Sequence, residues 1–231
     1  MTPLSGSPDH SLAPWAVWHA RAMVLAWGLL LPLGALLARF FKVLPGQAWP
    51  RVLDHKAWWH GHRALQWAGA GAMVLGLWQV WGQASGHLAG ATRVAQLHQA
   101  LGWLVCALCA LQILGGLVRG SKGGPGTAQM RGDHYDMTPW RQAFERLHKS
   151  LGWGAVVLSV GVLASGLVMA DAPRWMALAL ALWWFTLGAA FVALQRAGRC
   201  IDTYQAIWGP DPCHPGNQRR PIGWGVRRLS R

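Results

Sequence analysis

The sequence predicts an all-α integral membrane protein with five transmembrane helices, in which an antiparallel four-helix bundle is accompanied by one peripheral helix. Two observations carry this prediction. Of the 231 residues, 53% are hydrophobic and only 13% are charged, about half of the ~25% charge content of ordinary soluble domains. The charged residues also leave five long uncharged stretches, at 22–38, 64–92, 94–118, 150–170 and 175–195. A bilayer core needs ~20 mostly apolar residues per helix, so this pattern excludes a water-soluble enzyme.

The uncharged stretches predict helices at about 15–39, 57–83, 94–118, 145–170 and 175–196, inside one transmembrane domain at 15–197. Glycines and prolines punctuate the connections, and tryptophans gather at the helix ends as in interfacial belts. Short connections make sequential helices antiparallel neighbours. A short outer tail at 1–14 has no Lys or Arg and therefore lacks the positive start of a secretory signal. A basic cytoplasmic tail is expected at 198–231.

The net charge of +13 is explained by topology. With five spans, 18 of the 21 Lys and Arg residues fall on one side of the membrane, and only Arg21, Arg93 and Arg174 fall on the other. The positive-inside rule then places the amino terminus outside and the carboxyl terminus in the cytoplasm. We expect a multi-pass protein of a bacterial inner membrane, with the lipid bilayer as its first partner. No recognition motif interleaves the basic residues, so nucleic acid is not an expected partner.

The four cysteines do not form a disulfide framework in a chain of this size. Cys106 and Cys109 lie inside the third span and are interpreted as small buried side chains. Cys200, Cys213 and His214 are a metal-binding alternative near the carboxyl end, but the spacing of the two cysteines does not match common zinc sites. A solvated tail is the favoured interpretation of this region.

One short pattern occurs twice, each time at the amino end of a span. Leu97–Trp103 and Leu147–Trp153 both read L-H-x-x-L-G-W. The third and fourth helices run in opposite directions, so the two histidines of the repeat belong to opposite faces of the membrane. Related segments in inverted orientation are a known way to build one site in each leaflet.

Histidines stand near the ends of the first four helices, and ionisable groups inside spans are usually functional. Because the helices alternate in direction, His19 and His98 share the outer depth, while His62 and His148 share the inner depth. Facing helices of a bundle can supply the two axial ligands of a haem iron. The pattern therefore predicts two haem groups, one held by His19 and His98 and one by His62 and His148.

Other interpretations of the histidines remain open at this point. A single histidine at a helix end is more often interfacial than a ligand. Zinc fits less well than haem, because each depth offers two histidines and no dependable further ligand. His55 and His60 compete with His62 as the ligand of the second helix. A transporter or scaffold without redox chemistry, whose histidines conduct protons or stabilise packing, is the alternative from a different class.

Small residues recur on the histidine faces of the helices. Positions ~14 and ~18 beyond a histidine return to its face of an α-helix. They hold Gly76 on the second helix, Gly116 on the third and Gly166 on the fourth. The first helix matches less well, because Leu37 is the eighteenth residue after its histidine and Gly34 falls off the face.

The combination of these elements resembles the eukaryotic-type cytochrome b561 family, especially the modules attached to DOMON domains. The first helix carries His19-Ala20-Arg21-Ala22-Met23, followed by Ala26-Trp27-Gly28, Pro32, Gly34 and Ala38-Arg39-Phe40. The second has Trp58 four residues before and Gln66 four residues after His62, a spacing that selects His62 over His60. The third and fourth pair His98 with Gly102 and His148 with Gly152. The resemblance covers about residues 15 to 170.

This resemblance implies a di-haem b cytochrome that moves electrons across a membrane, with ligands paired first to third and second to fourth helix. Family members commonly take electrons from ascorbate and pass them to ferric chelates or monodehydroascorbate, so a small-molecule or protein donor and acceptor are expected. It also implies that Gln66, Gly102 and Gly152 help to form the haem sites. Arg39 and Arg119 are candidates to pair with haem propionates, although each also serves as a topology determinant.

The chain departs from the family pattern in having five predicted helices rather than six and no DOMON domain before them. A rival function is a haem b membrane-anchor subunit that links a quinone pool to a partner oxidoreductase. The fifth helix has no histidine and carries Trp183 and Trp184, so it is expected either at the periphery or as the contact surface of a homodimer.

Overall fold

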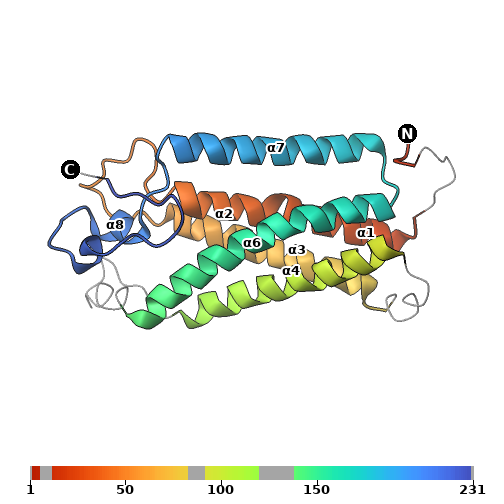
Figure 1. The fold of residues 1–231 in the computed structure, drawn as a ribbon, viewed down its shortest axis with the longest axis horizontal. Helices are drawn as coiled ribbons and strands as arrows, with labels where there is room; N and C mark the ends of the chain where they lie inside the picture. Colours follow the sequence, from red (N-terminus) through yellow and green to blue (C-terminus); the bar gives the residue numbers. More distant parts are fainter. Residues whose placement is uncertain (1, 6–11, 83–91, 120–137, 230–231) are drawn as a thin grey trace. The chain divides into compact units, whose positions relative to one another are not determined.

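The structure is a computed structural model that describes residues 2–5, 12–82, 92–119 and 138–229. Half of the expected outer tail at 1–14, residues 1 and 6–11, lies outside the described residues. Helices make up the described fold, and its β-structure is limited to isolated bridges. Figure 1 shows the elements in chain order: α1 (Pro14–Met23), a π-helical segment (Val24–Leu30), α2 (Leu31–Phe40), α3 (Ala57–Trp81), α4 (Arg93–Val118), α6 (Pro139–Met169), α7 (Arg174–Arg196), α8 (Thr203–Trp208) and a 3-10 turn (Pro215–Gln218).

Membrane-length helices confirm the predicted class, an all-α integral membrane protein. Within the described residues, four helical runs are long and apolar enough to cross a bilayer: Pro14–Phe40, Arg93–Val118, Pro139–Met169 and Arg174–Arg196. The last of these, α7, is the least buried, in keeping with a peripheral helix. The expected count of five is not met. The second expected span forms α3, which is helical over 25 residues but is not among these four runs.

Threonine caps determine where two of the helices begin. The Thr92 hydroxyl accepts a hydrogen bond from Ala95 N at the start of α4, and the Thr138 hydroxyl accepts one from Arg141 N at the start of α6. Pro139 occupies the first turn of α6, where a missing N–H costs nothing. The helix therefore begins six residues before the expected residue 145, because the uncharged stretch alone does not reveal its polar first turn.

The first membrane helix is not a uniform α-helix. Its middle, Val24–Leu30, is π-helical, a conformation that is rare and often found at functional sites. Pro32 is the second residue after this segment. It has no N–H to donate to the carbonyl of Gly28, four residues earlier. The indole N–H of Trp183 on α7 donates to that carbonyl at 2.7 Å, so a neighbouring helix stabilises the irregular backbone.

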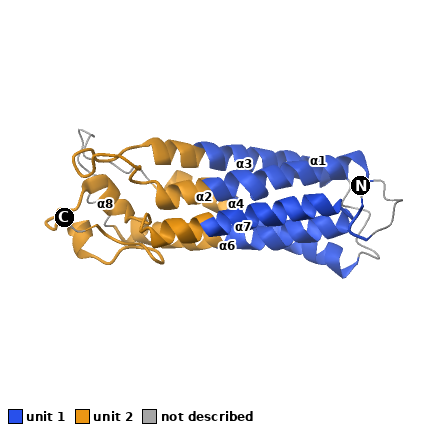
Figure 2. Cartoon of the chain, turned by 90° about the horizontal axis from the view of Figure 1, so that it is seen from above, with its two compact units in different colours: residues 1–33, 64–109, 154–189 blue, residues 34–63, 110–153, 190–231 orange. Residues whose placement is uncertain are grey.

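The chain divides into two compact units, coloured separately in Figure 2. Unit 1 comprises residues 1–33, 64–109 and 154–189, and unit 2 comprises residues 34–63, 110–153 and 190–231. Unit 1 buries apolar side chains such as Trp27 and Val105, with Ser159 as a buried polar residue. Unit 2 buries Phe40 and Val43 together with much of the carboxyl-terminal segment.

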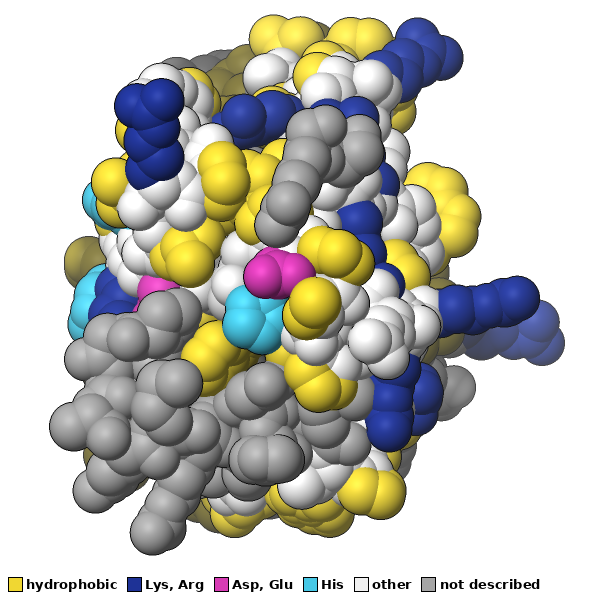
Figure 3. Space-filling view, turned by 90° about the vertical axis from the view of Figure 1, so that its left-hand side faces the viewer, with side chains coloured by type: hydrophobic (Ala, Val, Ile, Leu, Met, Phe, Trp, Pro, Cys, Tyr) yellow, Lys and Arg dark blue, Asp and Glu magenta, His cyan; other side chains and the backbone are white. Residues whose placement is uncertain are grey.

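The carboxyl-terminal segment corrects one expectation, because it is not simply a solvated tail. Cys200, Ile201 and all six residues of α8 are buried in unit 2. The ammonium of Lys42, just past the end of α2, donates to the Ile201 carbonyl at 3.1 Å. Figure 3 shows one face of the molecule, with several Lys and Arg side chains and few acidic ones. The segment is basic as expected, and it is also folded.

Candidate cofactor site: two histidine pairs

In unit 1 the structure brings His19 and His98 together. Their ring centroids are 6.3 Å apart and the ring planes make an angle of 76°. His19 lies on α1, and its Nδ1 is 2.9 Å from the Gly76 carbonyl near the end of α3. A carbonyl only accepts, so Nδ1 is the donor and carries the proton. In a neutral imidazole, Nε2 is then free to bind a metal.

His98, near the start of α4, is held by the end of α6. Its Nδ1 lies 3.1 Å from the Val162 carbonyl and 3.1 Å from the Ser165 hydroxyl. That hydroxyl donates to the Val162 carbonyl. A Cβ added to Gly166 would lie 3.1 Å from His98 Cε1, tighter than an ordinary van der Waals contact. Glycine at position 166 therefore leaves room for the imidazole ring.

In unit 2 the structure brings His62 and His148 together. Their centroids are also 6.3 Å apart, and the ring planes make an angle of 82°. His62 Nδ1 donates to the Gly34 carbonyl on α2 at 2.9 Å. His148 Nδ1 is buried and has no hydrogen-bond partner among the described residues. Three of the four histidines therefore have an oriented ring with a fixed tautomer, and the fourth does not.

Aromatic and cationic side chains surround the unit 2 pair. The Phe144 ring stacks on His148, with centroids 5.0 Å apart, and Trp59 lies 6.2 Å from His62. Arg119 places its guanidinium 4.1 Å from the Trp59 ring centroid and is close enough to interact electrostatically with both histidines. The expected cation Arg119 therefore lies beside this pair.

The geometry of both pairs fits a bis-histidine haem. Two imidazoles that bind one metal ion from opposite sides, with bonds of about 2 Å, have their centroids about 6 Å apart. In the described part of the chain, no three His, Cys, Asp or Glu side chains converge on one point. Each pair thus offers two ligands on its own, the number that an iron already held by four porphyrin nitrogens requires.

The hydrogen-bonded carbonyls follow a repeated spacing along the ligand helices. Each belongs to a residue that follows the histidine of its own helix by about four turns: Gly34 is fifteen residues after His19, Gly76 fourteen after His62, and Val162 fourteen after His148. In each case the histidine of one helix bonds to the backbone of its antiparallel neighbour.

The extra residue in the first helix is explained by its π-helical segment. A π-turn has one more residue than an α-turn, so with Val24–Leu30 in between, Gly34 corresponds to a fourteenth residue in an uninterrupted α-helix. The prediction that Gly34 falls off the histidine face is therefore wrong. Uniform α-helical periodicity does not hold along this helix, because the π-helical segment changes the angle between His19 and Gly34.

The other residues implied by the family resemblance are positioned differently from the histidines. Gln66 donates through Nε2 to the Leu31 carbonyl at 3.0 Å in unit 1 and so braces the backbone after the π-helical segment. A Cβ on Gly102, one turn after His98, would meet nothing within 4 Å. A Cβ on Gly152, one turn after His148, would lie 3.5 Å from the Gln112 side chain. The space at Gly102 is consistent with a flat group beside His98.

Arg39 has protein partners that sequence reasoning did not anticipate. Its guanidinium donates to Gln195 Oε1 and to the Trp224 carbonyl, both at 2.8 Å. It also lies 5.0 Å from the Phe191 ring centroid and 5.8 Å from that of Trp153. Arg39 is therefore joined to α7 and the carboxyl-terminal segment, and its expected pairing with a propionate stays a prediction.

The competing candidates are not paired in this way. His60 is exposed, and His55 Nδ1 interacts with Ala57 N, two residues further along, at 3.4 Å. Cys200 is buried whereas Cys213 is exposed. Among the described residues, Cys200 and Cys213 belong to no cluster of three or more metal-binding side chains.

Sequence reasoning missed the residues that position the histidines. Ser165 and the flanking rings of Trp59 and Phe144 carry no motif that distinguishes them from other small or aromatic residues in a membrane helix. Trp183 had a partial signal, because Pro32 predicts a carbonyl without its helical donor. The sequence does not say which of 17 tryptophans supplies that donor.

Comparison with known proteins adds one related sequence. No family model matches the chain, and no solved structure gives a significant match. A cytochrome b561, DM13 and DOMON domain-containing protein of Arabidopsis thaliana is 28% identical over 163 residues. These residues are 71% of this chain but 16% of the plant protein, so the chain spans less than a fifth of that relative's length.

Proposed function

We propose that this chain is a di-haem b cytochrome of the b561 type that carries electrons across a membrane. His19 and His98 would ligate one haem in unit 1, and His62 and His148 the other in unit 2. The observation that carries the proposal is the pair of equal centroid separations, 6.3 Å in each unit. The plant relative supports it, since its name contains cytochrome b561.

The chain's own residues would hold, orient and shield the cofactors. Haem b, when bound, supplies an iron that changes oxidation state by one electron. The carbonyls of Gly76, Gly34 and Val162 fix three imidazole rings and increase the basicity of the ligands. Two histidines per iron leave no open coordination position, which favours electron transfer over binding of a small molecule at the metal.

The donor and acceptor are proposed by analogy with the cytochrome b561 family. A small reductant such as ascorbate would supply electrons on one side, and a ferric chelate or an organic radical would accept them on the other. The proposed location is a bacterial inner membrane, with the amino terminus outside and the carboxyl terminus in the cytoplasm; the distribution of Lys and Arg supports this orientation. In this orientation the unit 2 pair is the cytoplasmic one.

The proposal is tested by purifying the full chain in detergent from haem-replete cells. We expect a red protein with a reduced b-type absorption spectrum and about two haems per chain. His62→Ala should lose about half of the haem, and His60→Ala is the matched control that should keep both. Reduction by ascorbate and by a quinol should be compared in the same preparations.

Three results would contradict the proposal or part of it. A colourless but fully folded preparation would remove the cytochrome function and favour a transporter or scaffold. Loss of haem from His60→Ala alone would overturn the choice of His62. Rapid reduction by quinol but none by ascorbate would replace the family-type donor with a quinone pool and favour a membrane-anchor subunit.

A further inference from the structure

Unit 2 contains a second concave site on the side of α6 that faces away from His148. It is a cavity of about 570 Å³, within the size range of ligand pockets. Its walls come from α2, α6, α7 and the carboxyl-terminal segment, including Arg39, Arg146, Lys149 and Trp224. On α6, residues 146, 150 and 153 lie roughly opposite residue 148 at about 100° per residue, and residue 149 lies to the side. The cavity is therefore separate from the histidine pair.

The lining of this cavity is cationic and aromatic. Four basic side chains contribute to it, and none of its described lining residues is an Asp or Glu. The positive charge of Lys149 is neutralised by Glu145, which does not line the cavity and pairs with it at 2.5 Å. Lys149 also donates to the Ile222 carbonyl. Arg146 donates to the neutral amide of Gln142 at 3.4 Å. Its positive charge stays available to an anion.

Arg39 is a partly buried cation in the lining of this cavity. Its hydrogen-bond acceptors are an amide oxygen and a backbone carbonyl, which carry no full negative charge. Its Nε is buried and has no hydrogen-bond partner among the described residues. Aromatic rings surround the guanidinium, with Phe191 at 5.0 Å and Trp224 at 5.6 Å. The guanidinium therefore keeps its positive charge, because no Asp or Glu among the described lining residues neutralises it.

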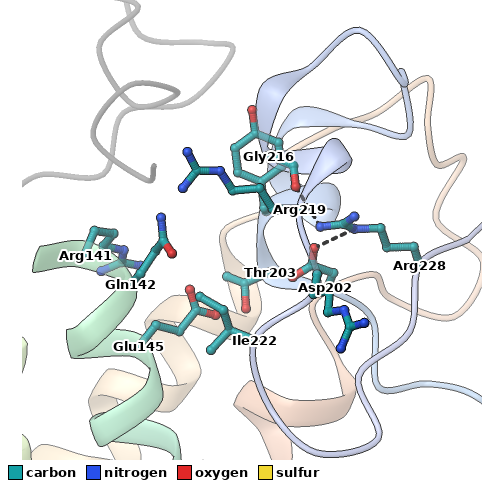
Figure 4. A pocket seen from close by; sticks show the side chains of 11 residues that line it. Arg141, Gln142, Glu145, Asp202, Thr203, Gly216, Arg219, Ile222 and Arg228 are labelled. Atoms are coloured by element: carbon teal, nitrogen blue, oxygen red, sulfur yellow. Dashed lines mark hydrogen bonds and ion pairs between the residues drawn. The ribbon is translucent and has the colours of Figure 1, made fainter. Parts of the chain in front are cut away.

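A neighbouring pocket in the same unit is also basic, but acidic side chains offset part of its charge. Figure 4 shows this smaller pocket of about 40 Å³, with side chains from α6 and the carboxyl-terminal segment. It is also rich in arginine, but Glu145 and Asp202 line it, and Arg228 binds Asp202 at 3.1 Å. The small pocket therefore has carboxylates that offset part of its positive charge, and it has room for only a few waters. Among its described lining residues, the larger cavity has no Asp or Glu to offset its positive charge.

From these observations we propose that the larger cavity binds the phosphate headgroup of an anionic phospholipid. Arg39 is the next-to-last residue of α2, and Phe191 lies near the end of α7, so the cavity is at the ends of membrane-length helices, where headgroups lie. Basic pockets between transmembrane helices bind such headgroups. Trp153, Phe191 and Trp224 provide an apolar wall for the glycerol and the first carbons of the chains.

The volume favours a lipid over a free anion with the same chemistry. Inorganic phosphate would fill a small part of about 570 Å³ and would leave the aromatic wall without contact. A phosphate that carries a glycerol backbone uses both the cations and the rings. The proposal depends on the membrane location of the chain and not on its haem content.

The test measures the thermal unfolding temperature of the purified full chain in maltoside micelles. Dioleoyl phosphatidylglycerol should raise this temperature in a saturable manner, whereas dioleoyl phosphatidylcholine and inorganic phosphate should leave it unchanged. Arg146→Gln and Arg220→Gln change exposed lining residues, so both variants should fold. Each should weaken the apparent affinity for phosphatidylglycerol about fivefold.

Arg51→Gln is the matched control, since Arg51 is an exposed arginine of unit 2 that does not line the cavity. It should bind phosphatidylglycerol as the wild type does. An equal loss in this variant would show diffuse attraction to the basic surface and overturn the site. Stabilisation by phosphatidylcholine to the same extent would also overturn it. Full stabilisation by inorganic phosphate would replace the lipid with a soluble anion.

Discussion

The two histidine pairs share a centroid separation of 6.3 Å, yet their surroundings differ. In unit 1, His19 and His98 both donate through Nδ1, and His98 has two acceptors. Within the described part of the chain, these two rings contact each other and no further aromatic ring. In unit 2, His62 donates to a carbonyl, whereas His148 Nδ1 has no hydrogen-bond partner among the described residues and its ring stacks on Phe144.

Charge separates the two units further. The charged side chains buried among the described residues, Lys42, Arg141 and Asp202, all lie in unit 2. Arg119 also acts on the unit 2 histidines. Among the described residues of unit 1, Ser159 is the one fully buried polar side chain. One ligand geometry is therefore placed in two electrostatic environments.

For the proposed cytochrome, this difference predicts which of the two haems has the higher reduction potential. A hydrogen bond donated by Nδ1 increases the basicity of the ligand and favours ferric iron, which lowers the reduction potential. A nearby cation favours the reduced site and raises the potential. We therefore expect the unit 2 haem to be the easier one to reduce, by at least about 40 mV for one hydrogen bond worth about 1 kcal/mol.

Removing one ligand from each pair gives the largest expected effect. His98→Ala and His148→Ala should each lose about half of the haem, because one pair is disabled in each variant. In a potentiometric titration, His98→Ala should retain the component of higher potential and His148→Ala the component of lower potential. The opposite assignment would show that hydrogen bonding and charge do not set the order of the two sites.

Lys42 makes the stability of unit 2 depend on pH. Burial lowers the pKa of its ammonium from 10.5 to about 7, and the positive charge of Lys149 adds to the shift. Between pH 7 and 10.5 the unfolded chain therefore holds a proton that the folded chain has released, so the free energy of unfolding rises with pH in this window. Thermal unfolding at pH 7, 8 and 9 measures the slope. Lys42→Met should flatten it, and an unchanged slope would exclude Lys42 as the cause.

Trp183 tests how unit 1 maintains its π-helical segment. Trp183→Phe removes the donor to the Gly28 carbonyl and should lower the free energy of unfolding by about 1–2 kcal/mol, since a buried acceptor is left without its partner. The matched control is Trp184→Phe, because the adjacent indole N–H is buried without a hydrogen-bond partner among the described residues. Equal losses in the two variants would attribute the effect to ring packing alone.

Ser165 should have the smallest effect. Ser165→Ala removes one of the two acceptors of His98 Nδ1 and leaves the Val162 carbonyl in place. We expect the lower-potential component to rise by less than about 40 mV, with the haem content unchanged. Thr186→Ala is the control, because its hydroxyl bonds only within α7, which carries no histidine. A shift of the higher-potential component instead would reverse the site assignment.

Sequence patterns predicted the helices better than their ends. Stretches without charge locate α4 and α7 to within a residue or so, because exclusion of charge is a property of each segment by itself. They placed the start of α6 six residues too late, since its first turn is polar and depends on the Thr138 cap. They also predict α3 as a fifth span, whereas α3 is not among the four described helices that are long and apolar enough to cross a bilayer.

The histidine pairing could be predicted because it depends on two local facts, the position of each histidine in its helix and the alternation of helix direction. The carboxyl-terminal segment could not be predicted in this way. Lys42 bonds to the Ile201 carbonyl from a distant part of the chain, and Asp202 pairs with Arg228 within the segment itself. Composition marks such a segment as basic and polar, and both folded and solvated segments share that composition.

The sequence by itself determined the membrane class, the apolar helices and the two candidate histidine pairs, because hydrophobicity and helix direction are encoded locally. Only the tertiary structure decided which carbonyls orient the rings, that a π-helical segment shifts Gly34 into line, and that His148 Nδ1 has no such carbonyl among the described residues. These features arise from contacts between distant helices, whose geometry depends on packing, and packing is not readable from any one segment.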